Sequence, residues 1–161
     1  MGEESLSTER LRLVLGTPAE TLAWVESLSP ADRAEVSPAW LARVQAAREP
    51  DPWLLGFALV DRVTDAVVGS CGFKGPPDAD GAVEIAYGID PAYRRRGYAT
   101  EAATGLVRFA FAAEQVRTIR AHTLPEKGAS ARVLEKCGFR CLGEVLDPED
   151  GRVWRWERAR D

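Results

Sequence analysis

The first half of the chain changes its hydrophobic period several times. Residues 9–15 alternate polar and apolar side chains up to Gly16, which predicts a strand. Helix starts at Thr17-Pro18 and at Ser37-Pro38 follow, because a capping hydroxyl and a proline at the first helical position are typical of a helix N-terminus. The sequence therefore predicts a strand followed by two helices, of which the second ends before Pro50.

The middle of the chain has the pattern of strands. Two apolar runs, 53–60 and 66–73, are separated by a short polar connection and predict a hairpin. The next segment, after Asp80-Gly81, alternates with a strict period of two. One face of this predicted strand is formed by Val83, Ile85, Tyr87 and Ile89, and the other by Glu84, Ala86 and Gly88.

The second half begins with the strongest helix signal, a broad apolar stripe over residues 97–114. A strand over 118–123, a helix over 127–137 and a last pair of strands over 139–145 and 152–157 follow. This order predicts an α/β (α+β) fold with a central mixed, mostly antiparallel, twisted sheet of about seven strands, flanked by about four helices.

Length and composition favour one domain over residues 1–161. A chain of 161 residues with 45% apolar content buries enough surface to fold without disulfides or metal. Its apolar runs are too short for a membrane helix, and its acidic N-terminus lacks a secretory pattern. Three cysteines without a CxxC pair fit a reducing compartment, so we expect a cytoplasmic protein in which all three pack as small apolar residues: Cys71, Cys137 and Cys141.

The charge is unevenly distributed. The net charge is -4, yet the first 80 residues hold 7 basic and 13 acidic side chains while the remainder hold 14 and 12. Much of the contrast comes from one cluster, Arg94 to Arg96, with no extended basic face and no alternation of basic and aromatic residues. This pattern disfavours nucleic-acid binding and places an anionic ligand in the C-terminal half.

The stretch from Tyr87 to Glu101 carries the most chemistry. A strand leads through an Arg/Gly turn directly into the long helix, so the free N–H groups of the first helical turn lie beside arginines. Gly97 lets the backbone turn and approach an anion closely. The chain contains neither GxxxxGK[ST] nor GxGxxG, which excludes the two common nucleotide motifs and leaves a phosphate cradle of another kind.

The spacing Arg94-x-x-Gly97-x-Ala99 resembles the pyrophosphate-binding signature [Q/R]xxGx[G/A] of the GNAT superfamily of acyl-CoA-dependent N-acyltransferases. The segment VEIAYGIDPAYRRRGYATEA, the later RVLEKCGF and the opening TERLRL resemble the ribosomal-protein N-terminal (alanine) acetyltransferase branch. The resemblance covers nearly the whole chain. It implies direct acetyl transfer from acetyl-CoA to a primary amine, either a protein N-terminal α-amine or a small molecule, and a possible homodimer.

The resemblance also implies which residues hold the cofactor. Backbone amides of the turn would bind the CoA pyrophosphate, and the preceding strand would pair with the pantetheine arm where it separates from its neighbour, a departure that Gly88 suits. The pyrophosphate residues are Arg94, Arg95, Arg96, Gly97, Tyr98 and Ala99, and the pantetheine residues are Tyr87, Gly88 and Ile89.

Two residues are candidates for catalysis. Glu84, on the small-residue face of the strand, is the candidate base, directly or through water; an exposed carboxylate or ion pair is the alternative. Ser130 is expected on an inward stripe with Val133, Leu134 and Cys137. The resemblance places it near the CoA sulfur or pantetheine, and a hydrogen bond to the helix backbone is the alternative.

Two positions depart from the family pattern. Lys127 replaces the usual asparagine, where it would reach a CoA phosphate or remain solvated, and Leu134 replaces the tyrosine that protonates the thiolate. His122, the only histidine, is interpreted as structural, and no spacing predicts a metal site. A non-catalytic acyl-CoA-binding or sensor domain, or another phosphate-binding protein, remains an alternative function.

Overall fold

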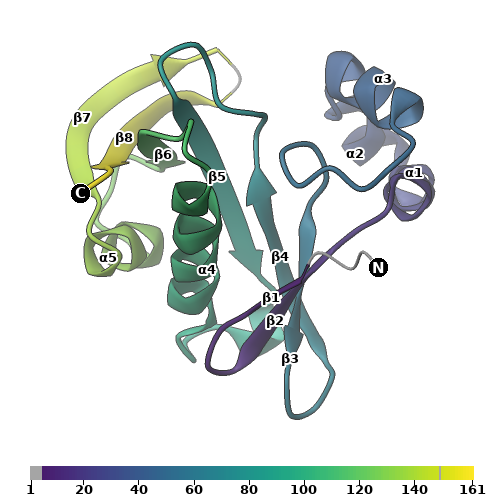
Figure 1. The fold of residues 1–161 in the computed structure, drawn as a ribbon, viewed down its shortest axis with the longest axis horizontal. Helices are drawn as coiled ribbons and strands as arrows, with labels where there is room; N and C mark the ends of the chain where they lie inside the picture. Colours follow the sequence, from purple (N-terminus) through teal and green to yellow (C-terminus); the bar gives the residue numbers. More distant parts are fainter. Residues whose placement is uncertain (1–4, 149) are drawn as a thin grey trace.

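The computed structural model describes residues 5–148 and 150–161, which contain one open sheet of eight strands (Figure 1). The strand order is β1-β2-β3-β4-β5-β6-β8-β7, and all neighbours are antiparallel except the parallel pair β5 and β6. The strands are β1 (Ser5–Ser7), β2 (Leu11–Leu15), β3 (Phe57–Asp61), β4 (Val67–Phe73), β5 (Ala82–Ile89), β6 (Thr118–Thr123), β7 (Arg140–Asp147) and β8 (Gly151–Ala159).

Five α-helices accompany the sheet in the described part of the chain. They are α1 (Pro18–Ser27), α2 (Pro30–Ala34), α3 (Pro38–Ala46), α4 (Tyr98–Ala112) and α5 (Ala129–Lys136), with a short 3-10 helix at Pro91–Tyr93. Helices α4 and α5 lie side by side, whereas α1 to α3 gather apart from them, at the upper right of Figure 1. None of these helices is long and apolar enough to cross a membrane.

The mixed, mostly antiparallel sheet confirms the predicted fold class, with one strand and one helix more than predicted. Strand β1 has three residues and α2 has five, and neither is long enough to show a hydrophobic period. The predicted strand start at Trp53 is wrong, because residues 53–55 form a turn in which the amides of Leu54 and Leu55 both donate to the carbonyl of Asp51. That strand begins at Phe57.

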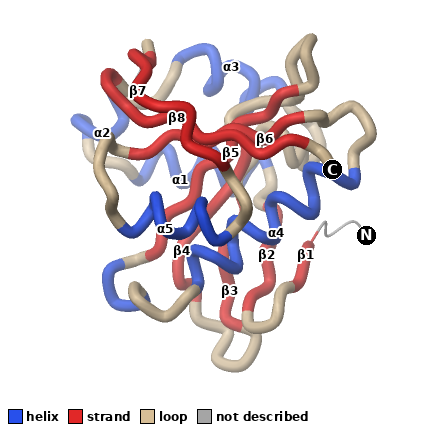
Figure 2. The backbone as a smooth tube through the Cα atoms, turned by 90° about the vertical axis from the view of Figure 1, so that its left-hand side faces the viewer, coloured by secondary structure: helices blue, strands red, loops and turns tan. Residues whose placement is uncertain are grey.

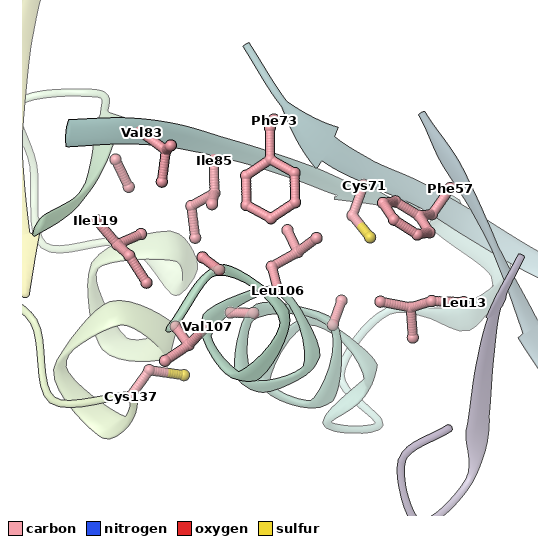
Figure 3. Packing of buried hydrophobic residues seen from close by; sticks show 14 of the residues in the cluster. Leu13, Phe57, Cys71, Phe73, Val83, Ile85, Leu106, Val107, Ile119 and Cys137 are labelled. Carbon is pink, nitrogen blue, oxygen red and sulfur yellow. The ribbon is translucent and has the colours of Figure 1, made fainter. Parts of the chain in front are cut away.

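Helix α4 supplies the centre of the core. Figure 3 shows Leu106 of α4 pointing toward side chains from the sheet, among them Phe73 of β4, while Val107 lies beside Cys137. Cys71 and Cys137 are buried in this cluster as expected, whereas Cys141 on the edge strand β7 is exposed. The apolar face of β5 thus packs on α4, and its opposite face, which carries Glu84, is turned away from this helix.

The parallel pair β5 and β6 is short, and this opens the sheet. Only residues 82–84 of β5 pair with residues 118–120 of β6. Beyond Glu84, β5 remains paired with β4 and β6 continues with β8 (Figure 2). We call this separation of β5 from β6 the split. It begins after Glu84, so Gly88 lies in the part of β5 that is separated from β6, while it remains paired with Ser70 of β4 on the other side.

Candidate functional site

A cavity of about 710 Å³ lies beside the split, between the end of β5, the turn that leads into α4, and α5. It brings most of the predicted cofactor residues together with one face of α5. Its lining residues are Tyr87, Gly88, Ile89, Tyr93, Arg94, Arg95, Gly97, Tyr98, Ala99, Thr100, Ala129, Ser130, Arg132, Val133 and Lys136.

Two helix N-termini without side-chain caps border this cavity. Gly97, with a left-handed φ of 84°, is the N-cap of α4, and Gly128 is the N-cap of α5; neither position provides a side-chain hydrogen bond to the helix. The three helices remote from the cavity are capped by hydroxyl side chains, namely Thr17, Ser29 and Ser37. The first-turn N–H groups of α4 and α5 are therefore available to an anion in the cavity.

The charged side chains that line the cavity are all basic. The lining includes four basic side chains and no carboxylate: Arg94, Arg95, Arg132 and Lys136. Sequence reasoning identified the first two and missed the pair on α5, although their i, i+4 spacing places them on one helix face. The backbone of Arg95 has a left-handed φ of 66°, which is strained for a residue with a Cβ and keeps the turn tight. A concentration of positive charge of this kind suits a ligand with several negative charges.

Two predicted cofactor residues lie outside the lining. The Arg96 guanidinium stacks over the Tyr93 ring, with its central carbon 5.6 Å from the ring centroid. Lys127 is exposed in the turn before α5. The structure therefore brings neither side chain into the cavity that the other predicted residues form.

The strand β5 presents unpaired backbone groups to the split. Hydrogen bonds from Lys74 N to Glu84 O (2.9 Å) and from Asp90 N to Val68 O (2.8 Å) show that the even-numbered residues of β5 use their backbone groups toward β4. Because these groups alternate along a strand, the odd-numbered residues point toward the split. Those beyond the last β6 pair are Ile85, Tyr87 and Ile89.

One of these carbonyl groups already accepts a hydrogen bond. The side chain of Arg94 folds back so that its Nε donates to Ile89 O at 3.0 Å. The groups of Tyr87 remain free to pair with an extended amide-containing chain, as an additional strand would. Gly88 turns its own backbone groups toward β4, and a Cβ added to it would meet no atom within 4 Å. It therefore contributes open space to the cavity.

A hydrogen-bonded network fixes the start of α4. Tyr98 Oη donates to Asp61 Oδ2 at 2.7 Å, and Arg10 stacks on the Tyr98 ring with its guanidinium carbon 4.6 Å from the centroid. The phenol lowers the pKa of Asp61 to about 2. Glu101 accepts hydrogen bonds from Thr8 Oγ1 at 2.6 Å and from the Arg10 amide at 2.9 Å, and it forms an ion pair with the Arg10 guanidinium. The cradle is therefore held to β3 and to the turn between β1 and β2.

Ser130 lies on the cavity wall and not in the core. The buried stripe of α5 consists of Ala131, Leu134 and Cys137, while Ser130 is exposed, so the expectation that it turns inward is wrong. Leu134 has no exposed surface and cannot reach a reacting group. The phenol of Tyr87 lies 3.5 Å from the backbone oxygen of Ser130, and burial raises the pKa of Tyr87 to about 12. A neutral hydroxyl from β5 thus lies beside the first turn of α5.

Glu84 lies on the opposite face of the sheet, at the start of the split, and makes no contact with Ser130. Its Oε2 is 3.1 Å from Lys74 Nζ and 3.0 Å from His122 Nδ1. Burial alone would lower the pKa of Lys74, but the Glu84 and Asp150 carboxylates outweigh this effect and raise it. The Glu84 side chain is 23% exposed, which leaves it accessible from solvent.

His122 is part of this arrangement and is hydrogen-bonded through both ring nitrogens. Its Nδ1 contacts Glu84, and its Nε2 accepts from Arg155 Nε at 3.1 Å. Sequence could not reveal the contact, because it depends on the parallel register that sets Glu84 opposite Arg120. In the part of the chain that the structure describes, no three His, Cys, Asp or Glu residues form a group that could hold a metal ion.

Comparison with known proteins identifies the family of the chain. A family model described as an acetyltransferase (GNAT) domain matches residues 8–140. An uncharacterized N-acetyltransferase of Bacillus subtilis, YjdG, is 36% identical over 106 residues, which cover 66% of this chain and 58% of that protein. The match with this curated relative therefore spans somewhat over half of the relative's length.

Solved structures share the fold at low sequence identity. The ribosomal L7/L12 α-N-protein acetyltransferase RimL, in complex with coenzyme A, has a TM-score of 0.72 at 13% identity, covering 97% of this chain and 98% of its own. The ribosomal-protein-S5-alanine acetyltransferase of Vibrio fischeri has a TM-score of 0.69 at 18% identity, covering 98% and 97%. Together with the family match over residues 8–140, they establish that the chain belongs to the GNAT acetyltransferase family.

Proposed function

We propose that this protein transfers an acetyl group from acetyl-CoA to a primary amine. The observation that carries the proposal is the cavity beside the split. It combines two uncapped helix N-termini, four basic side chains without a carboxylate, and free backbone groups of β5. A pyrophosphate matches the first two features and the amides of a pantetheine arm match the third.

The residues present fit CoA in two parts. The amides of Gly97, Tyr98 and Ala99, with Arg94 and Arg95, would hold the pyrophosphate. The backbone of Tyr87 and the amide of Ile89, next to the open space at Gly88, would pair with pantetheine. Bound acetyl-CoA supplies the thioester that is cleaved. Arg96 and Lys127 are assigned no contact, because both lie outside the cavity lining.

Glu84 is the proposed general base. In the transfer, the amine nitrogen forms a bond to the acetyl carbon, the carbon–sulfur bond breaks, and the amine loses one proton. Glu84 Oε2 is occupied by two donors, whereas Oε1 has no hydrogen-bond partner among the described residues and would accept that proton, directly or through one water molecule. Its place at the start of the split allows a group on this face to reach a thioester in the opening.

Ser130 is the proposed neighbour of the departing sulfur. Its hydroxyl lies in the first turn of α5 on the cavity wall, on the side of the sheet opposite Glu84. The thiolate would then receive its proton from this hydroxyl or from solvent, since buried Leu134 provides no acid.

Two classes of acceptor agree with this site. The family likeness includes an enzyme named as an α-N-protein acetyltransferase, which favours a protein N-terminal α-amine, and the same chemistry serves a small-molecule amine.

A catalytically silent acyl-CoA-binding domain is the second candidate function. The specific observation in its favour is that Leu134, where the superfamily has an acidic phenol, is completely buried.

A two-step assay tests the proposal. Thermal unfolding with acetyl-CoA, CoA, ATP or NAD identifies the ligand, and thiol release on a panel of peptides, amino acids, polyamines and aminoglycosides identifies the acceptor. Stabilisation by acetyl-CoA and thiol release with at least one amine support acetyl transfer. Stabilisation without release for any amine supports the silent domain, and stabilisation by ATP or NAD but not CoA contradicts both.

A further inference from the structure

Both ring nitrogens of the only histidine make hydrogen bonds, one with a carboxylate and the other with a guanidinium group. The His122 side chain is 5% exposed. Its Nδ1 lies 3.0 Å from Glu84 Oε2, and its Nε2 lies 3.1 Å from Arg155 Nε. These three residues come from three adjacent strands of the sheet, β6, β5 and β8, and form a line across the face opposite α4.

The contact with Arg155 determines where the imidazole proton resides. A guanidinium group only donates hydrogen bonds, so His122 Nε2 must accept and carries no proton. The ring proton is then on Nδ1, from which it is donated to Glu84. A proton on Nε2 would face the Arg155 donor directly.

Glu84 is therefore restrained from two sides. Its Oε2 accepts from His122 Nδ1–H and from Lys74 Nζ at 3.1 Å, so two donors hold one oxygen of the carboxylate. The same two bonds orient the carboxylate so that its second oxygen is left for another partner.

We infer that Arg155 is a positioning residue for the transfer reaction and acts through His122 on Glu84. This inference rests on the proposed function, in which Glu84 removes the amine proton. By fixing the Nδ1–H form of the imidazole, Arg155 keeps a donor directed at Glu84 Oε2 and so keeps Oε1 free and oriented. Without Arg155, the ring proton is free to move from Nδ1 to Nε2, and Nδ1 then has no hydrogen to donate to Glu84.

The other charged groups on this face have partners of their own. Arg120 binds Glu157, with Nε 2.8 Å from Oε2, and Asp150 lies 3.4 Å from Lys74 Nζ. Among the residues that the structure describes, neither Arg120 nor Asp150 bonds to the imidazole, and Arg155 is the donor that faces Nε2. This makes Arg120, on the same face of β6, a matched control.

The experiment uses the fact that the chain has one histidine. Nitrogen-15 NMR of the histidine-labelled full chain gives a single pair of ring signals, which report whether each nitrogen carries a proton. The wild-type protein and Arg120→Met should show Nδ1 protonated and Nε2 unprotonated, and Arg155→Met should show Nε2 protonated and Nδ1 without its proton. Protonated Nε2 in the wild type, or unchanged signals in Arg155→Met, would overturn the inference.

Kinetics provide the functional half of the test. For an amine acetylated by the wild type, Arg155→Met should lower kcat about tenfold, a part of the 10²- to 10⁴-fold contribution of a general base, with an unchanged KM for acetyl-CoA. Arg155→Lys, which keeps a cationic donor, should recover part of the loss. An unchanged kcat in Arg155→Met, or no recovery in Arg155→Lys, would contradict the positioning role.

The two halves also separate this inference from the proposed function. If the wild type acetylates no amine, the proposed function fails and the positioning role fails with it, while the NMR signals still decide the state of His122. If amines are acetylated and the NMR signals of Arg155→Met match the wild type, the inference alone is wrong.

Discussion

Tyr98 Oη donates a 2.7 Å hydrogen bond to Asp61 Oδ2, which joins the first turn of α4 to the end of β3. The contact fixes the N-terminus of α4, which borders the cavity, to β3. This strand contributes no residue to the cavity lining. The amide groups of residues 63 and 64 donate two further hydrogen bonds to Asp61, so both oxygens of its carboxylate accept hydrogen bonds. Its ionisation is therefore linked to the stability of the cradle.

This link predicts a pH dependence. The hydrogen bond from Tyr98, together with the two amides, lowers the pKa of Asp61 from 3.8 to about 2 in the folded protein. Since the folded pKa is the lower one, Asp61 stabilises the fold above pH 3.8 and loses this contribution as the pH falls toward 2. The melting temperature of Asp61→Asn should lie below that of the wild type at pH 6 and converge with it by pH 2. A constant difference across this range would contradict the role of Asp61.

The turn before α4 depends on glycine at position 97. Its φ of 84° is unfavourable for any residue with a Cβ, and a Cβ there would lie 3.0 Å from Arg10 Nη2. Gly97→Ala should therefore destabilise the protein by about 1 kcal/mol more than Gly128→Ala, which is also at an N-cap but has a φ of -101°. Urea unfolding measures the difference, and equal effects of the two substitutions would show that the left-handed turn is not strained by a side chain.

The basic pair on α5 should contribute to CoA binding. Arg132 and Lys136 face the cavity from the wall opposite the cradle, and neither has an ion-pair partner among the described residues. Replacing both with glutamine should weaken CoA binding about 10-fold or more and reduce its salt dependence, because two attractive charges are lost. Titration calorimetry at two salt concentrations provides the measurement.

The control for this pair is Arg108→Gln, which removes an exposed cation from α4 at a position outside the cavity lining. Its CoA affinity should match that of the wild type. If Arg108→Gln weakens binding as much as the α5 double substitution does, the effect comes from net charge and not from contact in the cavity.

The sequence predicted the helices and strands that have a strong hydrophobic period. It also predicted the site residues that lie close together along the chain. Helix α4, strands β5 and β6 and the turn between 94 and 99 were all identifiable, because each depends on local spacing. The inward face of α5 was misassigned: with eight residues, a stripe through Ser130 and one through Ala131 fit similarly well, and only packing against α4 decides.

Contacts between distant segments could not be predicted in the same way. The meeting of Glu84, His122 and Arg155 depends on the parallel register of β5 with β6 and on β8 being next to β6, and neither is encoded by a local pattern. The basic pair on α5 became visible only when its helix was placed beside the cradle.

The role of Glu84 is the least supported by local sequence and the most important for the chemistry. Glu84→Gln retains the size of the side chain and its ability to accept from His122 or Lys74, but removes the base. The substitution should leave stabilisation by acetyl-CoA unchanged, since Glu84 lies on the face of the sheet away from the cavity.

The most direct test of acetyl transfer by this site is thiol release from acetyl-CoA, measured for the wild type and Glu84→Gln with each amine of the panel and checked by the mass of the acetylated product. The proposed mechanism predicts one acetylated amine per thiol released by the wild type, and a rate roughly 10²-fold lower for Glu84→Gln at the same acetyl-CoA affinity. Equal rates for the two proteins, or acetyl-CoA binding by the wild type without acetylation of any amine, would contradict it.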